Sequence, residues 1–107
     1  MTSKPELVYQ TELGKAFRGD SLTLTGTKHL SKNSVDLIVT SPPFPLEVPK
    51  RYGNKNKSEY LDWLETFFEG WRYVLKDTGS IVIDIGNSYE KGGPKRSLFI
   101  YELALRM

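Results

Sequence analysis

The stretch that decides the fold is VDLIVTSPPF, which runs from Val35 to Phe44. Its first six residues are mostly apolar and β-branched and follow a polar turn at 31–34, a pattern typical of a buried strand. Two prolines end that strand, because proline has no backbone N–H to donate to a sheet. The sequence therefore predicts a buried strand over 35–40, followed by a loop rich in Pro, Gly, Asn and Lys that runs to Lys57.

A long amphipathic helix is predicted after this loop, over residues 58–75. Ser58 is a suitable N-cap, and apolar side chains recur at helical spacing. Gly70 is costly inside a helix, so we expect close packing against it. The side chains predicted to face the core are Tyr60, Leu61, Leu64, Phe67, Phe68, Trp71, Val74 and Leu75.

A second apolar run without alternation covers residues 80–85, and such runs suit parallel strands that are covered on both faces. Residues 97–107 have a helical pattern. The side chains of this last helix that are predicted to point inward are Leu98, Phe99, Tyr101 and Leu105.

The part of the chain before residue 35 is less clearly patterned. Residues 1–14 are predicted to be an N-terminal arm with few tertiary contacts. Residues 15–18 form a candidate strand, and residues 21–30 a candidate helix whose threonines and glycine count against it.

The predicted order alternates strands and helices, which indicates an α/β fold with a partial, doubly wound parallel sheet. In such sheets, ligands bind beyond the carboxyl ends of the strands. The rule selects three places in this chain: Gly19–Asp20, Ser41–Phe44 and Asp84–Asn87.

Composition excludes several classes of protein. Hydrophobic residues make up 38% and charged residues 26%, a balance typical of a folded globular domain. No apolar run approaches the length of a membrane span, and residues 1–6 lack the apolar stretch of a secretory signal. There is no cysteine, so neither a disulfide framework nor a thiolate metal site is expected. We therefore expect a cytoplasmic protein with no membrane partner and no metal.

Basic residues gather in the loops rather than across the whole chain, whose net charge is only +2. Such loops can meet DNA phosphates, since phosphate neutralisation tolerates imprecise geometry. On charge alone, simple solvation of the loops is the better interpretation. The candidate phosphate-binding residues are Lys50, Arg51, Lys55 and Lys57, with a second group at Lys91, Lys95 and Arg96.

The chemistry is expected at Ser41–Phe44. Proline holds the backbone so that its carbonyls can act as acceptors, Ser41 adds a hydroxyl, and Phe44 adds a flat face. Acceptors beside an aromatic plane suit a planar ring that carries an exocyclic amine. An isolated Pro-Pro would more simply be a turn with Phe44 in the core, but the strand, the basic loop and the helix around it favour a site.

In this setting, residues 35–44 resemble the catalytic motif of DNA methyltransferases that methylate amines. Ser-Pro-Pro-Phe is typical of the cytosine-N4 members, whereas Asp with Tyr is typical of adenine-N6 members. The loop around Arg51–Asn54 and the segment Phe17–Ser21 are also similar to this family, and the resemblance covers roughly residues 15–105.

The resemblance implies a Rossmann-like fold that binds S-adenosylmethionine. It also implies transfer of the methyl group to the N4 amine of a cytosine that is flipped out of double-stranded DNA. Such an enzyme would belong to a restriction-modification system. Ser41 and the Pro42 carbonyl would hold the amine, Pro43 would fix the loop, and Phe44 would stack on the base. Asp20 and Ser41 would contact the cofactor. For Asp20, capping of the following helix is an equally good interpretation.

Other polar residues are predicted to lie outside the chemistry. Asp36 and Asp84 are interpreted as structural acids, and His29 as a surface residue. The absence of cysteine excludes the cysteine-dependent route to carbon 5 of cytosine.

Family members with this motif order carry a glycine-rich cofactor loop late in the chain, and no Phe-x-Gly-x-Gly occurs here. We therefore expect residues 15–107 to be the catalytic part of a domain that is incomplete at its C-terminus. It would be a fragment, or half of a split enzyme completed by a second polypeptide with that loop and the target-recognition region. Alone, it should be inactive and bind S-adenosylmethionine weakly. An adenine-N6 enzyme fragment, or an inactive remnant that binds DNA or a partner, remains an alternative.

Overall fold

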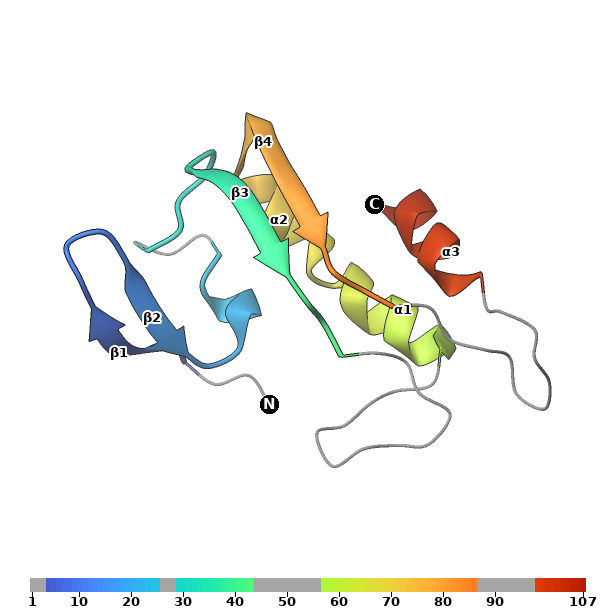
Figure 1. Cartoon of the computed structure of the whole chain (residues 1–107), viewed down its shortest axis with the longest axis horizontal. Helices are drawn as coiled ribbons and strands as arrows, with labels where there is room; N and C mark the ends of the chain where they lie inside the picture. The colour runs from blue at the N-terminus through green and yellow to red at the C-terminus, as the bar shows by residue number, and fades with distance from the viewer. Residues whose placement is uncertain (1–3, 26–28, 44–56, 87–97) are drawn as a thin grey trace.

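The computed structural model describes residues 4–25, 29–43, 57–86 and 98–107, with the backbone alone at Lys57, Ser58 and Phe99. Two small sheets and the helices around them make up this part of the chain (Figure 1). In chain order the elements are β1 (Glu6–Gln10), β2 (Lys15–Arg18), the 3-10 turn η1 (Ser21–Thr23), β3 (Val35–Thr40), α1 (Lys57–Glu65), α2 (Phe68–Val74), β4 (Leu75–Ile83) and α3 (Phe99–Arg106).

Strands β3 and β4 pair in parallel, as predicted, with α1 and α2 between them in the chain. Val39 lies opposite Val82, and Thr40 lies opposite Ile83. The backbone N–H of Asp84 donates to the Thr40 carbonyl at 2.9 Å, so the pairing continues to the carboxyl ends of both strands. In the view of Figure 1, α2 lies behind this pair, and α1 lies beyond the carboxyl end of β4.

The predicted helix over 58–75 is interrupted, so that α1 and α2 are separate helices. At the break, the N–H groups of Thr66 and Phe67 bond to carbonyls three residues back, each at 3.1 Å. The Thr66 hydroxyl also donates to the Trp63 carbonyl, and such local side-chain bonds compete with the regular helix. Strand β4 follows α2 directly at Leu75, earlier than the predicted residue 80.

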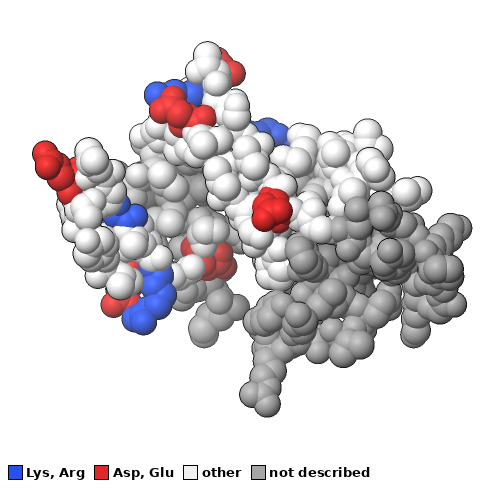
Figure 2. Space-filling model, in the orientation of Figure 1, with Lys and Arg blue, Asp and Glu red and all other residues white. Residues whose placement is uncertain are grey.

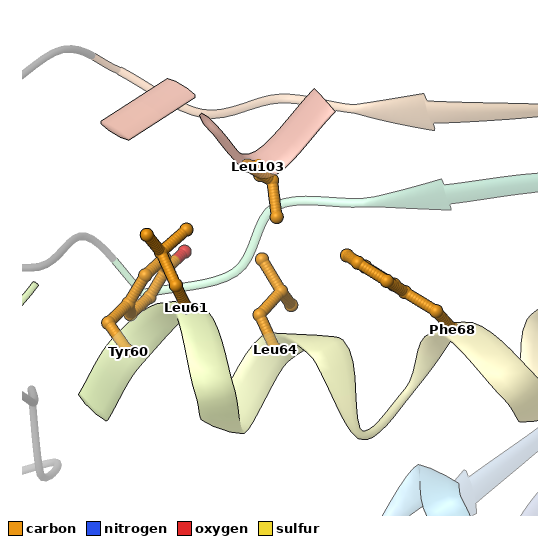
Figure 3. Close-up of a cluster of buried hydrophobic side chains, with 5 residues drawn as sticks. All are labelled: Tyr60, Leu61, Leu64, Phe68 and Leu103. Atoms are coloured by element: carbon orange, nitrogen blue, oxygen red, sulfur yellow. The ribbon is translucent and has the colours of Figure 1, made fainter. Parts of the chain in front are cut away.

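The main core lies on the inward face of α1 and α2, where the prediction placed it. Five side chains there are no more than 3% exposed, four from α1 and α2 and one from α3 (Figure 3): Tyr60, Leu61, Leu64, Phe68 and Leu103. Burial of an aliphatic or aromatic side chain contributes about 1.5–3 kcal/mol. This cluster therefore accounts for much of the stability of the helical half.

Helix α3 is rotated relative to the prediction. Leu98, Tyr101 and Leu105 are largely exposed, and Leu103 is buried instead. The Arg106 guanidinium lies 2.9 Å from Asp62 and 3.2 Å from Glu65, both on α1. Burial of Leu103 in the core cluster and these ion pairs hold α3 against α1, a helix that is distant in the sequence. The side chain of Phe99 lies outside the described part.

The N-terminal region also departs from the prediction. Residues 6–10 form β1, which pairs antiparallel with β2, although every residue of β1 is exposed. The helix predicted over 21–30 is wrong: of the residues described there, 21–25 and 29–30, only those of η1 are helical, and a parallel bridge joins Thr25 to Leu30. The hydroxyls of Thr23 and Thr25 donate to the carbonyls of Asp20 and Leu22, bonds that compete with a helix.

The sheet itself is smaller than predicted. Strand β2 was expected to join β3 and β4 in one parallel sheet, but in the described residues β1–β2 and β3–β4 are separate two-stranded sheets. The polar turn and η1 lie between them in the chain. No helix in the described part of the chain is long and apolar enough to cross a membrane.

Close packing at Gly70 is confirmed. A Cβ atom at this position would lie 3.1 Å from two side-chain atoms of Thr25. Glycine therefore lets α2 approach the segment that follows η1, and this contact ties the N-terminal region to the helical half.

Candidate active site

Ser41, Pro42 and Pro43 stand immediately beyond β3, at the carboxyl end of the parallel pair. Pro42 is buried, whereas Ser41 and Pro43 are exposed. The Asp84–Thr40 hydrogen bond holds the residue before Ser41 against β4. A fixed backbone thus presents the Ser41 hydroxyl at the edge where α/β proteins bind ligands. Phe44, the predicted stacking partner, lies outside the described residues.

A cavity of about 580 Å³ opens beside this turn. Its volume is in the range of small-molecule sites. Ser41, Pro42 and Pro43 line it together with most of β3, and Leu24 and Leu30 line it from the N-terminal region. The lining is mainly apolar but includes the hydroxyl-bearing residues Ser21, Thr25, Thr40 and Ser41. The structure thus brings the motif and the segment after Asp20 around one space.

A row of aromatic rings runs along α1 and α2 next to the cavity. The ring centroids of Trp63 and Phe67 are 5.3 Å apart, and those of Phe67 and Trp71 are 5.9 Å apart. All three residues line the cavity and also pack against the buried core. The sequence predicted burial for Phe67 and Trp71 from helical spacing, but it gave no signal that Trp63 or the cavity would be there.

Tyr60 begins the same aromatic row, with its ring centroid 5.8 Å from that of Trp63. Burial raises the pKa of the Tyr60 phenol to about 12. The phenol is neutral at physiological pH, and the ring belongs to the core cluster beside Trp63.

Asp20 has the capping role that the sequence left open. Its Oδ1 accepts the N–H of Leu22 at 3.0 Å, at the start of η1. Gly19 before it has a φ of +144°, and a Cβ there would lie 3.1 Å from the Lys4 carbonyl oxygen. The backbone conformation of the turn after β2 is therefore fixed by Gly19 and by the Asp20 cap. Cofactor binding by Asp20 remains a prediction.

The remaining polar candidates fall in different places. Asp36 forms an exposed ion pair with Lys76 at 3.0 Å, consistent with a structural role. The Asp84 backbone N–H supports the turn through its bond to the Thr40 carbonyl, and the residue is exposed. His29 is half-buried rather than a surface residue, because its ring packs on Phe17 with centroids 4.6 Å apart.

The predicted DNA-binding residues cannot be placed in this site. Lys50, Arg51 and Lys55 lie outside the described residues, and of Lys57 only the backbone, at the start of α1, is described. The second basic group, Lys91, Lys95 and Arg96, also lies outside them. Contact of these residues with phosphates stays a prediction.

The sequence profile of a family described as DNA methylase matches residues 35–106, about two thirds of the chain. The chain belongs to this DNA methylase family. The matched region begins at the first residue of β3 and ends in α3. The region therefore includes Ser41–Pro43 and the helices α1 and α2.

Curated relatives are type II methyltransferases. M.PvuII of Proteus hauseri is 40% identical over 99 residues, which cover 92% of this chain and 29% of that protein. M.BglII of Bacillus subtilis is 33% identical over 83% of this chain and 24% of its own length. This chain thus spans less than a third of the length of either methyltransferase.

A solved structure, described as PvuII DNA methyltransferase (cytosine-N4-specific), matches with a TM-score of 0.79 and 38% identity. The match covers 100% of this chain and 37% of that one. It confirms the predicted α/β methyltransferase fold, with only part of its sheet formed by the described residues.

Proposed function

We propose that this chain forms the catalytic part of a DNA methyltransferase that methylates the N4 amine of cytosine. One observation carries the proposal: the exposed Ser41 stands beside buried Pro42 at the carboxyl end of β3, over a cavity. Membership of the DNA methylase family supports it, as does the similarity to a cytosine-N4-specific enzyme. The type II methyltransferase relatives favour a role in restriction and modification.

In the proposed mechanism, the Ser41 hydroxyl and the Pro42 carbonyl accept hydrogen bonds from the cytosine amine. These bonds orient the nitrogen lone pair toward the methyl carbon, and positioning supplies most of the rate enhancement. As the N–C bond formed, the bond between sulfur and the methyl carbon would break, the donor would leave as a neutral thioether, and one amine proton would then be released to solvent. Phe44 would stack on the ring of the cytosine, which must leave the duplex because its amine is otherwise paired.

S-adenosylmethionine, when bound, supplies the electrophilic methyl group. The residues near the motif fit such a cofactor: Ser21 and Ser41 line the same cavity, and Ser21 follows Asp20 directly. The cap at η1 engages only Oδ1 of Asp20, so its other oxygen can accept a bond from the adenine amine. We propose that Asp20 and Ser41 contact the cofactor.

The proposed partners are double-stranded DNA and a second polypeptide that supplies the glycine-rich loop and the target-recognition region. The basic residues Lys50, Arg51, Lys55 and Lys57 would neutralise phosphates. Such contacts make binding depend steeply on salt concentration, which gives a direct measurement of their role.

The function is tested by mixing this chain with the part of Proteus hauseri M.PvuII that lies outside the region of similarity. Labelled S-adenosylmethionine and duplex DNA are added, and the nucleosides are separated. We expect N4-methylcytosine, and a loss of at least about tenfold in transfer rate for Ser41→Ala. Ser80→Ala, another exposed serine in the same sheet, is the matched control. N6-methyladenine as the product, or full transfer by Ser41→Ala, would contradict the proposal.

A further inference from the structure

The two prolines after β3 cannot donate to the sheet ladder. Pro42 and Pro43 have no backbone N–H, so the turn cannot continue the pairing beyond the bond that the Thr40 carbonyl accepts from Asp84 at 2.9 Å. Pro42 is nevertheless buried, whereas Ser41 and Pro43 are exposed. The Ser41 hydroxyl therefore keeps a fixed direction only if packing holds the prolines that follow it.

The sheet side of the molecule offers this turn little support. In the view of Figure 2, the described surface over β3 and β4 carries few charged side chains. Exposed ion pairs contribute little in any case. The restraint must therefore come from the helical side, where three aromatic residues line the cavity beside the turn: Trp63, Phe67 and Trp71.

The geometry of the crossover places one of these rings level with the turn. The two helices run back along the sheet, and Leu75, directly after α2, pairs with Val35 at the start of β3. A strand rises about 3.3 Å per residue, so Thr40 lies about 17 Å along β3 from Val35. A helix rises about 1.5 Å per residue, so Trp63 lies about 18 Å from Leu75 and Trp71 only about 6 Å from it. Trp63 is thus level with the end of β3, whereas Trp71 is level with its start.

The Trp63 side chain is itself fixed by its neighbours. Its ring centroid is 5.8 Å from that of Tyr60 and 5.3 Å from that of Phe67, which it meets edge to face at 77°. The Trp63 carbonyl accepts bonds from both the N–H and the hydroxyl of Thr66, at the break between α1 and α2. Trp63 also packs against the buried core cluster while it lines the cavity together with the turn. It can therefore transmit the rigidity of the core to the turn.

We propose that Trp63 is a positioning residue, whose indole packs on the rings of Pro42 and Pro43 and so fixes the direction of the Ser41 hydroxyl. Tryptophan presents a broad apolar surface, which suits two rigid proline rings. The inference rests on the proposed function, because the direction of Ser41 matters only if Ser41 holds the amine. Displacement of a reacting group by about 1 Å can cost about a hundredfold in rate. Loss of this support should therefore slow methyl transfer while the fold persists.

The contact and the restraint are measured on this chain alone, labelled with ¹⁵N and ¹³C. NOEs are expected between the Trp63 indole and the ring protons of Pro42 or Pro43. In Trp63→Leu, the order parameter of the Ser41 N–H should fall from about 0.85, typical of rigid backbone, to about 0.6 or below. Phe68→Leu is the matched control and should leave Ser41 unchanged, because among the described residues Phe68 belongs to the core cluster but does not line the cavity. Absence of the NOEs, or equal mobility of Ser41 in both variants, would overturn the proposal.

The effect on catalysis is measured after mixing with the part of Proteus hauseri M.PvuII outside the region of similarity. Trp63→Leu should lower kcat at least about tenfold, because the hydroxyl no longer holds the reacting geometry. The KM for DNA should change by less than about threefold, since phosphate contacts supply most of the affinity. Trp63→Phe keeps an aromatic face and should recover most of the loss, and it replaces Trp63→Leu if that variant does not fold. A parallel loss of kcat in Phe68→Leu would indicate general destabilisation and overturn the proposal.

This proposal and the proposed function fail separately. Greater mobility of Ser41 in Trp63→Leu, with no methyl transfer by the unsubstituted mixture, would sustain the support of the turn and contradict the enzymatic proposal. Formation of N4-methylcytosine at an unchanged kcat in Trp63→Leu would do the reverse.

Discussion

The helical half of this molecule and its N-terminal hairpin are held by different forces. In the cluster on α1, α2 and α3, five side chains are no more than 3% exposed. In β1 every residue is exposed, and the strand is held by its backbone pairing with β2 and by the ion pair of Arg18 with Glu6 at 2.7 Å. An exposed ion pair contributes little to the free energy of unfolding. The candidate site therefore depends on the packed helical half for its rigidity.

The sharpest test of this difference compares two leucines. Leu64→Ala removes a buried side chain from the core and should lower the free energy of unfolding by about 2–5 kcal/mol. Leu13→Ala, in the hairpin turn at 98% exposure, should change it by no more than about 0.5 kcal/mol. Urea unfolding followed by tryptophan fluorescence measures both. Similar losses would show that the hairpin is packed as tightly as the core.

Gly70→Ala tests the contact that joins the two regions. Alanine favours a helix by about 1 kcal/mol over glycine, but its Cβ would crowd Thr25, whose hydroxyl is bonded to the Leu22 carbonyl. Overpacking costs about 1–3 kcal/mol, so a net loss of about 1 kcal/mol is expected. Addition of Thr25→Ala should recover part of it. A more stable single variant would mean that the N-terminal region moves easily away from α2.

Ionisation of Tyr60 should lower the stability of the helical half at alkaline pH. Its folded pKa of about 12 is above the ordinary value of 10.0. The neutral phenol therefore favours the folded state fully below pH 10, and this contribution is lost as the pH rises toward 12. Tyr60→Phe should flatten the pH dependence of the unfolding free energy over this interval.

The smallest expected effect concerns the attachment of α3. The Arg106 guanidinium donates hydrogen bonds to Asp62, Glu65 and Glu102, and the bond that it donates to Asp62 is the main reason that the pKa of Arg106 is raised. Arg106→Gln should accelerate amide exchange in α3 while leaving exchange in β3 unchanged. Arg18→Gln, which breaks the ion pair in the hairpin, is the matched control and should leave α3 unaffected. Equal exchange in α3 with and without Arg106 would show that Leu103 alone holds the helix.

The sequence was most informative where one physical pattern dominated. Apolar runs without alternation predicted β3 and the second half of β4, and helical spacing predicted the inward face of α1 and α2. The prolines predicted the end of β3 and the place of Ser41. In η1 and α3, by contrast, local hydroxyl bonds and ion pairs to another helix decided the outcome, and sequence patterns do not report those partners.

By itself, the sequence determined that a buried strand, β3, ends before Ser41–Pro43, because β-branched runs bury well and proline cannot continue a ladder. The tertiary structure alone decided that α3 turns Leu103 inward, and that Leu24, Leu30 and Trp63 enclose a cavity beside the motif. These features depend on groups brought together from distant parts of the chain. Burial and hydrogen-bond geometry select among such arrangements as these groups meet during folding, so a local sequence pattern does not report the result.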